Sequence, residues 1–228
     1  MSKKKKTHEE SGFETVEHAL TRTEQYVEEN KKSLSIILAV ILGIVVVYMA
    51  YNKFLLKPQE TEAQSQIFRA EQYFEKDSFL LALEGDGDAY GFIDIIDEYG
   101  ITNTANLAQY YAGICYLRLG DYEQAIEHLK KFDSNDKIVS LIAMGAIGDA
   151  YVELDDLDEA ISFYEEATSK HKNEFITAIY LKKLGLVYEE TDNYKKALAA
   201  YEKIKKEFPN SEEARDIDKY IEAAKLKL

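Results

Sequence analysis

The sequence predicts an all-α protein in which one membrane-spanning helix precedes a solenoid of stacked helix pairs. An uncharged run of 18 residues, Leu34–Tyr51, lies near the N-terminus. After it, one pattern of glycine, tyrosine and alanine occurs three times. Strand patterns are nearly absent, and only Pro58 and Pro209 could interrupt a helix as prolines do. This composition predicts long helices with few breaks.

The run Leu34–Tyr51 is long enough to cross a bilayer once. Eighteen helical residues extend about 27 Å, close to the ~30 Å hydrocarbon core, and Leu55 and Leu56 lengthen the run while Lys53 snorkels to the interface. A buried core helix would need protein around every face of the run. A cleaved signal peptide is disfavoured, because a long charged tail precedes the run and no small-x-small site follows it. We therefore predict a signal anchor over residues 33–56.

Lysine and arginine side chains predict the orientation of this anchor. Seven of them lie within residues 1–32, whereas Lys53, Lys57 and Arg69 are the only ones in the twenty residues after the uncharged run. This excess predicts a cytoplasmic N-terminus and a C-terminal domain on the other side of the membrane.

The tail of residues 1–32 carries an amphipathic pattern. Phe13, Val16, Leu20 and Val27 recur at helical spacing, with charged residues between them. Two interpretations are open. The juxtamembrane helix either lies in solvent or on the membrane surface, or it docks on the cytoplasmic side of a membrane partner.

The part of the chain after the anchor carries the net charge. The formal net charge is −14, and the tail holds seven basic and seven acidic residues. The remaining 21 basic and 35 acidic residues account for the whole charge. Such an acidic domain would repel phosphates, which argues against a nucleic-acid partner. The chain has a single cysteine, Cys115, so it cannot form an internal disulfide.

Two sequence motifs, each present three times and always at the same distance from each other, define a repeated unit. LGDYEQAIEHL, LDDLDEAISFY and TDNYKKALAAY place three alanines 35 and 37 residues apart: Ala125, Ala160 and Ala197. Twelve residues before each alanine stands a Gly-x-x-Tyr motif, made by Gly113 and Tyr116, Gly148 and Tyr151, and Gly185 and Tyr188. We predict a helix, a short turn and an antiparallel helix, with small residues at the contact and tyrosines filling the space between.

This unit resembles the tetratricopeptide repeat, a helix pair with small residues at positions 8 and 20 and a proline at position 32. The resemblance implies one domain over 57–228. Its parts would be a degenerate repeat at 60–104, repeats at 106–139, 141–174 and 178–211, and a capping helix at 211–226. Only the third repeat keeps the proline, Pro209, and Gln109, Met144 and Leu181 stand where tryptophan is usual.

The histidines do not form a recognisable site. They are His8, His18, His128 and His171. None of them stands four residues from another or close to the cysteine in sequence. The repeat register places His128 on the outward face of a second helix. Metal ligation or a nucleophile–base pair would require the fold to gather these residues. We therefore predict no catalytic residue, no metal site, no cofactor, no small-molecule substrate and no enzymatic activity.

An acidic stretch at residues 84–88 resembles the start of a calcium loop. Its carboxylates alternate, but Ala89 stands where the sixth-place glycine is required. Ile95 likewise replaces the bidentate glutamate. A turn with flexible glycines is the better interpretation.

The resemblance implies a partner-binding groove along the first helix of each repeat. The groove residues are Leu107, Tyr110, Ile114, Leu117, Ile142, Asp149, Val152, Ile179, Lys182 and Leu186. The lysine and asparagine clamp that holds acidic tails of heat-shock proteins is missing. An open apolar patch of this kind is uncommon unless it binds something. The alternative is that residues 60–100 or the terminal helix fill the groove.

A short tail, one span and a repeat domain together resemble the bacterial YfgM-like family, and FIDIIDEYG and GAIGDAY resemble its Bacteroidetes branch. The resemblance implies an ancillary subunit of the Sec translocon in the inner membrane, with a role in periplasmic chaperoning. The implied partners are translocon subunits, periplasmic chaperones or unfolded secreted clients. Two other functions stay open: a structural scaffold for an envelope or secretion complex, and a cytosol-facing receptor of reversed orientation.

Overall fold

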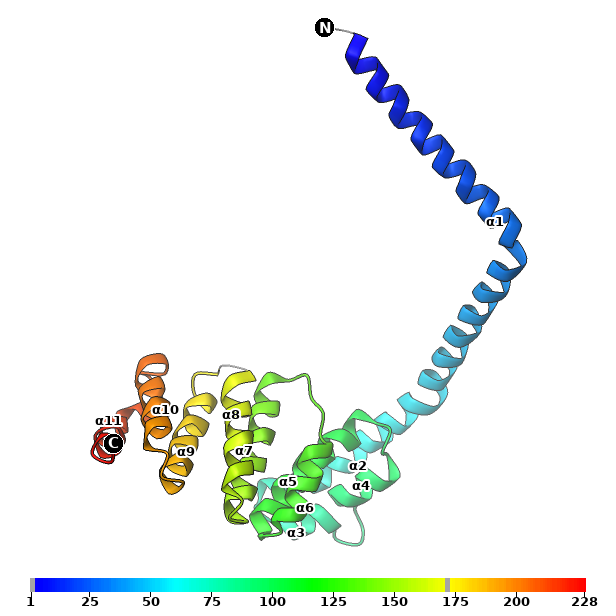
Figure 1. The fold of residues 1–228 in the computed structure, drawn as a ribbon. Helices are drawn as coiled ribbons and strands as arrows, with labels where there is room; N and C mark the ends of the chain where they lie inside the picture. The colour runs from blue at the N-terminus through cyan, green and yellow to red at the C-terminus, as the bar shows by residue number, and fades with distance from the viewer. Residues whose placement is uncertain (1–2, 171–172) are drawn as a thin grey trace. The chain divides into compact units, whose positions relative to one another are not determined.

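All regular structure in the described part of the chain is helical. The computed structural model describes residues 3–170 and 173–228, with side chains described for 27–169 and 173–228. Within these residues the chain forms helices, turns and loops without a strand (Figure 1). The predicted all-α fold class is confirmed. The chain divides into two compact units, residues 1–57 and 58–228, which are described in turn.

The first unit is one long helix, α1 (Lys3–Tyr51), followed by a π-helical turn, η1 (Asn52–Leu56). Among the described residues, a helical run beginning at Val27 is long and apolar enough to cross a membrane, and none of its most apolar 18-residue window is buried. Its β-branched side chains are exposed, as the 69% exposure of Val47 illustrates. A core helix of a soluble protein would be largely covered instead.

The amphipathic pattern of the tail falls on α1. The backbone of this segment is helical. The side chains of Phe13, Val16 and Leu20 lie outside the described part, so the role of their apolar face stays a prediction.

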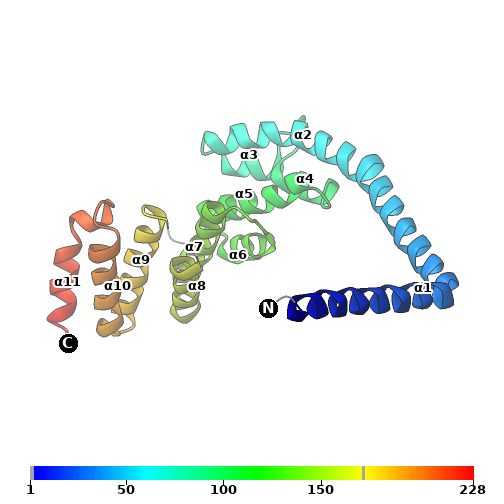
Figure 2. The same cartoon turned by 90° about the horizontal axis from the view of Figure 1, so that it is seen from above.

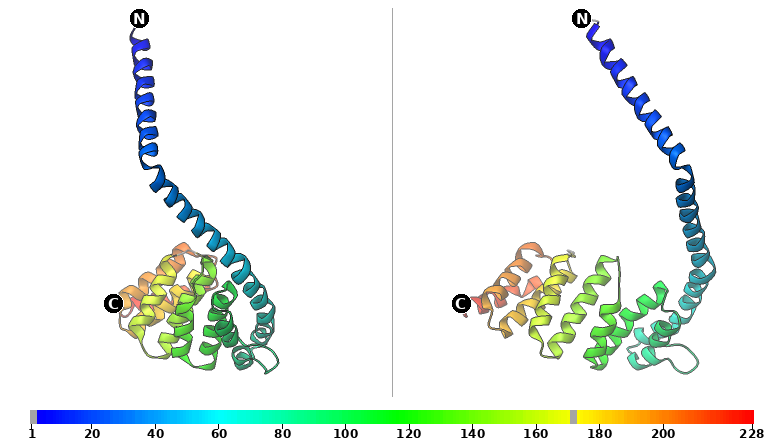
Figure 3. Two further views of the ribbon diagram at one scale, coloured as in Figure 1. Left: turned by 90° about the vertical axis from the view of Figure 1, so that its right-hand side faces the viewer. Right: turned by 45° about the vertical axis from the view of Figure 1, so that its right-hand side comes forward.

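The second unit is a row of helices packed side by side (Figures 2 and 3). It begins with three helices: α2 (Lys57–Glu75), α3 (Phe79–Glu84) and α4 (Phe92–Glu98). Three antiparallel pairs follow: α5 (Asn103–Leu119) with α6 (Tyr122–Lys131), α7 (Lys137–Glu153) with α8 (Leu157–Lys170), and α9 (Ile176–Glu190) with α10 (Tyr194–Glu207). The short 3-10 helix η2 (Glu213–Arg215) and α11 (Ile217–Lys225) close the row.

The turn inside each helix pair is built in the same way. A residue with positive φ precedes the residue that caps the second helix: Gly120 before Asp121, Asp155 before Asp156, and Asp192 before Asn193. Each capping side chain accepts a hydrogen bond from the backbone N–H three residues later. The N–H of each capping residue donates to the carbonyl of the Gly-x-x-Tyr tyrosine, at 2.7–3.0 Å.

The connection between α2 and α3 repeats this construction. Asp77 has a φ of 55°, and the N–H of Ser78 donates to the carbonyl of Tyr73 at 2.9 Å. Ala70 and Ala82, both fully buried, take the places of the glycine and the alanine of the later repeats. The N-terminal part of the domain therefore carries a fourth copy of the turn, with a second helix that ends early.

A glycine on each first helix lets a large side chain of the second helix lie against its backbone. The pairs are always 16 residues apart: Gly113 with Leu129, Gly148 with Tyr164, and Gly185 with Tyr201. A Cβ atom added to these glycines would lie 2.5, 2.6 and 2.2 Å from those side chains, closer than real contacts allow. The three partners are almost completely buried, so they cannot swing away.

A long-range hydrogen-bond group joins α2 to the first full repeat. The Glu60 carboxylate accepts from the backbone N–H of Asn103 and from the Thr104 hydroxyl, both at 2.7 Å. It also accepts from the Gln64 side-chain amide at 3.0 Å. Glu60 thus supplies a negative group to the N-terminus of α5, where the helix dipole favours one.

Gly185→Ala should lower the free energy of unfolding by about 1–3 kcal/mol, because the new methyl group overpacks the contact with Tyr201. Ser162→Ala, at an exposed position of α8, should change it by under about 0.5 kcal/mol. Urea denaturation of both variants measures the difference. Equal midpoints would contradict the proposed packing.

Glu60→Gln should destabilise the protein by about 1 kcal/mol at neutral pH, because the helix loses a charged cap. Burial alone would raise the pKa of Glu60, but the hydrogen bonds from Thr104, Asn103 and Gln64 lower it below the ordinary value. A carboxyl group with a lowered folded-state pKa stabilises the fold above its unfolded-state pKa, and this contribution is lost as the pH falls through the folded-state value.

The difference between wild type and Glu60→Gln should therefore shrink as the pH falls below about 4. Glu202→Gln, an exposed change on α10, serves as the control. A Glu60 effect that is the same at pH about 3 and about 7 would show that the cap is not electrostatic.

Candidate functional site

Two neighbouring clefts lie along the C-terminal halves of the first helices, and they are together called the groove. The first has a volume of about 500 Å³ and is lined by Leu117, Arg118, Tyr122, Asp149, Val152, Glu153, Tyr164, Lys183, Leu186 and Val187. The second, of about 350 Å³, is lined by Leu186, Glu189, Glu190, Tyr194, Ala223 and Lys227. The two clefts share one lining residue, Leu186 of α9. Volumes of this size are typical of ligand pockets.

A hydrogen-bonded group around Asp149 connects the second and third repeats beside the groove. The carboxylate of Asp149 accepts from the Tyr164 hydroxyl at 2.5 Å and from Lys183 Nζ at 2.7 Å to each oxygen. The Lys183 ammonium also lies 5.6 Å from the centre of the Tyr180 ring. Burial, and then the charge of Asp149, raise the pKa of Tyr164 far above its usual range, so its hydroxyl stays protonated. This group holds α7, α8 and α9 in register.

The rim of the groove combines both charges with apolar surface. The Tyr122 hydroxyl donates to Glu153 at 3.2 Å and links the first two repeats. Arg118 lies beside this pair with its side chain exposed. Leu186 is 43% exposed, although its side chain is apolar. The groove thus offers apolar contact area next to charged groups.

The N-terminal half of the predicted groove is partly filled by the chain itself. Tyr180 of α9 is almost completely buried, and its hydroxyl donates to the carbonyl of Ile142 at 3.3 Å. Its ring occupies the space where Gly145 lacks a side chain. Tyr110 packs against Phe132, with ring centres 5.4 Å apart. The side chain that fills this region therefore comes from the neighbouring repeat.

The predicted groove residues fall into three groups. Four of them line the first cleft: Leu117, Asp149, Val152 and Leu186. Four are half-buried along α5 and α7: Leu107, Tyr110, Ile114 and Ile142. Ile179 is exposed, whereas Lys182 pairs with Asp216 at 3.0 Å and lies 4.9 Å from the centre of the Tyr220 ring. The lysine is thus engaged by the C-terminal part of the chain.

Several residues that line the clefts are not predicted from the sequence. Lys183, Arg118 and Tyr122 are not among the groove residues that the resemblance to the tetratricopeptide repeat implies. The Tyr122 and Tyr164 hydroxyls could have been suspected from one signal, because a buried tyrosine usually needs a hydrogen-bond partner. The partner of Tyr122, Glu153, lies in the next repeat, and that of Tyr164, Asp149, lies on the other helix of its own pair. Neither partner is contained in the repeat pattern.

The prediction that His128 faces outward is wrong. His128 is only 9% exposed, and its Nδ1 lies 2.7 Å from Gln109 Oε1. Its ring stacks on Tyr116, with ring centres 5.2 Å apart. Gln109 stands where the repeat usually has tryptophan, and this smaller polar side chain leaves both space and a partner for the imidazole. Burial lowers the pKa of His128.

The acidic loop at residues 84–88 is a closed turn. Asp86 accepts from the Tyr73 hydroxyl at 2.5 Å and from the backbone N–H groups of Asp88 and Ala89 at 3.0 and 2.8 Å. The hydrogen bond from Tyr73 is the main cause of the lowered pKa of Asp86. The carboxylate that would bind a cation is thus committed to the chain.

Other titratable groups give no evidence of a reactive site. No cluster of three or more metal-ligating side chains occurs among the described residues, although His8, His18 and His171 lie outside them or have undescribed side chains. Burial raises the pKa of the Cys115 thiol to about 12, so the thiol is unreactive at neutral pH.

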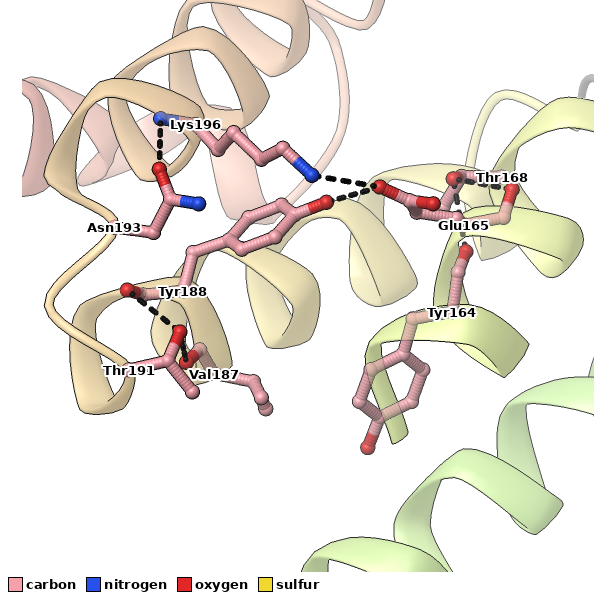
Figure 4. Close-up of polar contacts among 8 residues, drawn as sticks. All are labelled: Tyr164, Glu165, Thr168, Val187, Tyr188, Thr191, Asn193 and Lys196. Atoms are coloured by element: carbon pink, nitrogen blue, oxygen red, sulfur yellow. Dashed lines mark hydrogen bonds and ion pairs between the residues drawn. The ribbon is translucent and has the colours of Figure 1, made fainter. Parts of the chain in front are cut away.

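A third cleft, of about 730 Å³, lies between α8, α9 and α10. Figure 4 shows the polar group at one of its walls: the Tyr188 hydroxyl donates to Glu165, and Lys196 Nζ lies 3.6 Å from the same carboxylate. The Lys196 ammonium also lies 5.0 Å from the centre of the Tyr188 ring. Glu165 is therefore engaged by two helices, and this wall connects the second repeat to the third.

Comparisons with known proteins agree with the repeat architecture. Two family models described as tetratricopeptide repeat match residues 107–136 and 142–205. These segments carry tetratricopeptide repeats. Repeats of this kind are protein–protein interaction modules and are typically not catalytic.

A curated relative, the uncharacterized protein ycf37 of Guillardia theta, is 32% identical over 101 residues, which are 42% of this chain and 55% of the relative. The chain thus spans about half the length of that relative.

Among solved structures, the MamA protein is 24% identical with a TM-score of 0.53, covering 72% of this chain and 91% of that one. A Podosopora anserina protein with nearly identical TPR-like repeats, described as a kinesin light chain, is 13% identical with a TM-score of 0.55. That match covers 74% of this chain and 87% of the other. These two likenesses show the fold alone.

A double-mutant cycle between Asp149→Asn and Lys183→Met should give a coupling free energy of about 0.5–3 kcal/mol, because the two residues share one hydrogen-bonded group. Lys205 and Asp218 also form an ion pair, at 2.6 Å, but both side chains are more than half exposed. Their cycle should give under about 1 kcal/mol. Equal coupling at both pairs would show that the group around Asp149 does not join the repeats.

Proposed function

We propose that the protein is a single-pass membrane-anchored adaptor whose groove binds an extended segment of a partner protein. The observation that supports this most directly is the first cleft of the groove, in which Leu117, Val152 and Leu186 combine apolar surface with charged neighbours. Apolar side chains of the partner would be buried against these residues, at about 25 cal/mol per Å². Polar groups at the rim would fix the direction of the segment.

The charge around the groove favours a partner segment with basic residues. Asp149 and Glu153 line the first cleft beside Arg118 and Lys183, and Glu189 and Glu190 line the second beside Lys227. The lining therefore has one more acidic than basic residue. The domain is acidic overall, which would steer cationic segments toward it. Modest affinity would suffice, since anchoring in a membrane raises the local concentration of the domain near its partner.

The anchor and its flanking charges support a location in the bacterial inner membrane, with the N-terminus in the cytoplasm and the repeats in the periplasm. The exposed apolar helix is suited to a bilayer, and the basic residues before it suit the cytoplasmic side. The resemblance to the YfgM-like family supports an ancillary role at the Sec translocon. Its partners would be translocon subunits, periplasmic chaperones or unfolded secreted proteins.

An alkaline phosphatase fused after Leu228 should be active in a bacterial host, because the phosphatase functions only outside the cytoplasm. Exchanging the basic residues Lys31 and Lys32 for glutamine weakens the charge bias and should lower that activity. An inactive phosphatase fusion beside an active cytoplasmic reporter would reverse the orientation and remove the translocon hypothesis.

A photoreactive amino acid at Leu186 should crosslink the protein in membranes to translocon subunits, chaperones or secreted proteins. The matched control is Glu123, an exposed position on α6 outside the clefts, which should give none of these products. Crosslinks from Leu186 to envelope enzymes, without secreted clients, would favour the structural scaffold. Equal products from both positions would show that the groove is not the binding site.

A further inference from the structure

The carboxylates of the first cleft have partners within the chain, whereas one carboxylate of the second cleft does not. In the first cleft, Asp149 accepts from Lys183, and Glu153 accepts from Tyr122. In the second cleft, Glu189 is half-buried, and its Oε1 atom is buried without a hydrogen-bond partner among the described residues. Such an atom is energetically unfavourable, because it has lost water and gained nothing in exchange.

The Tyr201 hydroxyl group lies near this carboxylate but does not neutralise it. Tyr201 is fully buried, and its hydroxyl group makes no hydrogen bond of regular geometry within the described part of the chain. Burial, and then the charge of Glu189, raise the pKa of Tyr201 above its usual range, so the hydroxyl group stays protonated. A neutral hydroxyl group leaves the negative charge of Glu189 in place.

The position of Glu189 in its helix makes its charge less favourable still. Glu189 and Glu190 stand in the last turn of α9, which has no basic residue. The helix dipole disfavours negative charge at this end of a helix. Lys227 lines the same cleft, but its ammonium group lies at the Tyr194 ring, 6.0 Å from the ring centre. The second cleft therefore has an excess of negative charge that a cation from outside the chain would offset.

From this arrangement we infer that the second cleft is a subsite for one basic side chain of the partner segment. The ammonium group of a lysine or the guanidinium group of an arginine would pair with Glu189, while the apolar part of that side chain would lie along Leu186 and Ala223. Hydrogen bonds between charged groups are stronger than neutral ones, so this cleft would select a basic residue over a neutral residue of the same shape. The inference rests on the proposed function and specifies which residue type the partner carries at this point of the groove.

The test measures the retention of defined peptide pools by the immobilised full chain in mild detergent. In each pool of fluorescent nonapeptides, the central residue is fixed as arginine, lysine or citrulline, and the other positions vary among uncharged residues. Citrulline keeps the shape of arginine without its charge. At about 0.15 M salt, which screens long-range attraction, wild type should retain the arginine and lysine pools about fivefold more than the citrulline pool. This ratio corresponds to about 1 kcal/mol, as expected for one hydrogen-bonded contact.

Two variants test whether Glu189 causes this preference. Glu189→Gln keeps the size of the side chain and removes its charge, so it should retain the three pools equally, and the citrulline pool as well as wild type does. Glu202→Gln removes the same charge from an exposed position on α10 and should leave the preference unchanged. An unchanged preference in Glu189→Gln, or an equal loss in Glu202→Gln, would overturn the inference.

The wild-type measurement separates the subsite from the proposed function without any variant. Equal retention of the three pools by wild type would overturn the subsite alone and leave the groove as a binding site for extended segments. Retention of none of the pools would overturn the binding of extended segments and, with it, the subsite.

Discussion

The repeat domain depends on one steric constraint, which is the contact between a glycine on the first helix of each pair and a bulky side chain 16 residues later. Leu129, Tyr164 and Tyr201 each lie against such a glycine backbone. Since dispersion and burial reward close packing, the absence of a Cβ atom fixes both the distance and the rotation of the two helices. The turn that follows is then the same in every pair, with a left-handed residue, a capping side chain and a tyrosine carbonyl.

The groove is a consequence of stacking these similar pairs. Because each pair has nearly the same geometry, the first helices α5, α7 and α9 line up and their C-terminal halves share one surface. The contacts between pairs involve other residues than the repeated glycine contact inside a pair. They are polar groups such as Asp149 with Lys183, and aromatic groups such as Tyr180 over Gly145. These contacts keep the surface open near Leu186 and close it near Ile142.

The sequence predicts the parts of this structure that depend on local spacing. The glycine–tyrosine–alanine pattern identifies the helix pairs, because those residue types are required by the contact itself. Contacts between repeats, such as Glu60 at the start of α5, join residues more than 40 positions apart and leave no periodic signal. The outward orientation predicted for His128 is wrong for a related reason. Its register position faces outward in a typical repeat, but Gln109 in place of tryptophan draws the imidazole inward.

An occupied groove outside the cytoplasm is tested by cysteine labelling in intact cells with a maleimide that does not cross the inner membrane. Leu186→Cys is compared with Glu123→Cys, and the native Cys115 is buried and unreactive. We expect the cysteine at position 123 to be labelled both in cells and after purification. The cysteine at position 186 should be protected in cells and labelled only after purification. Equal labelling of both in cells would contradict an occupied groove, and no labelling of either would contradict a domain outside the cytoplasm.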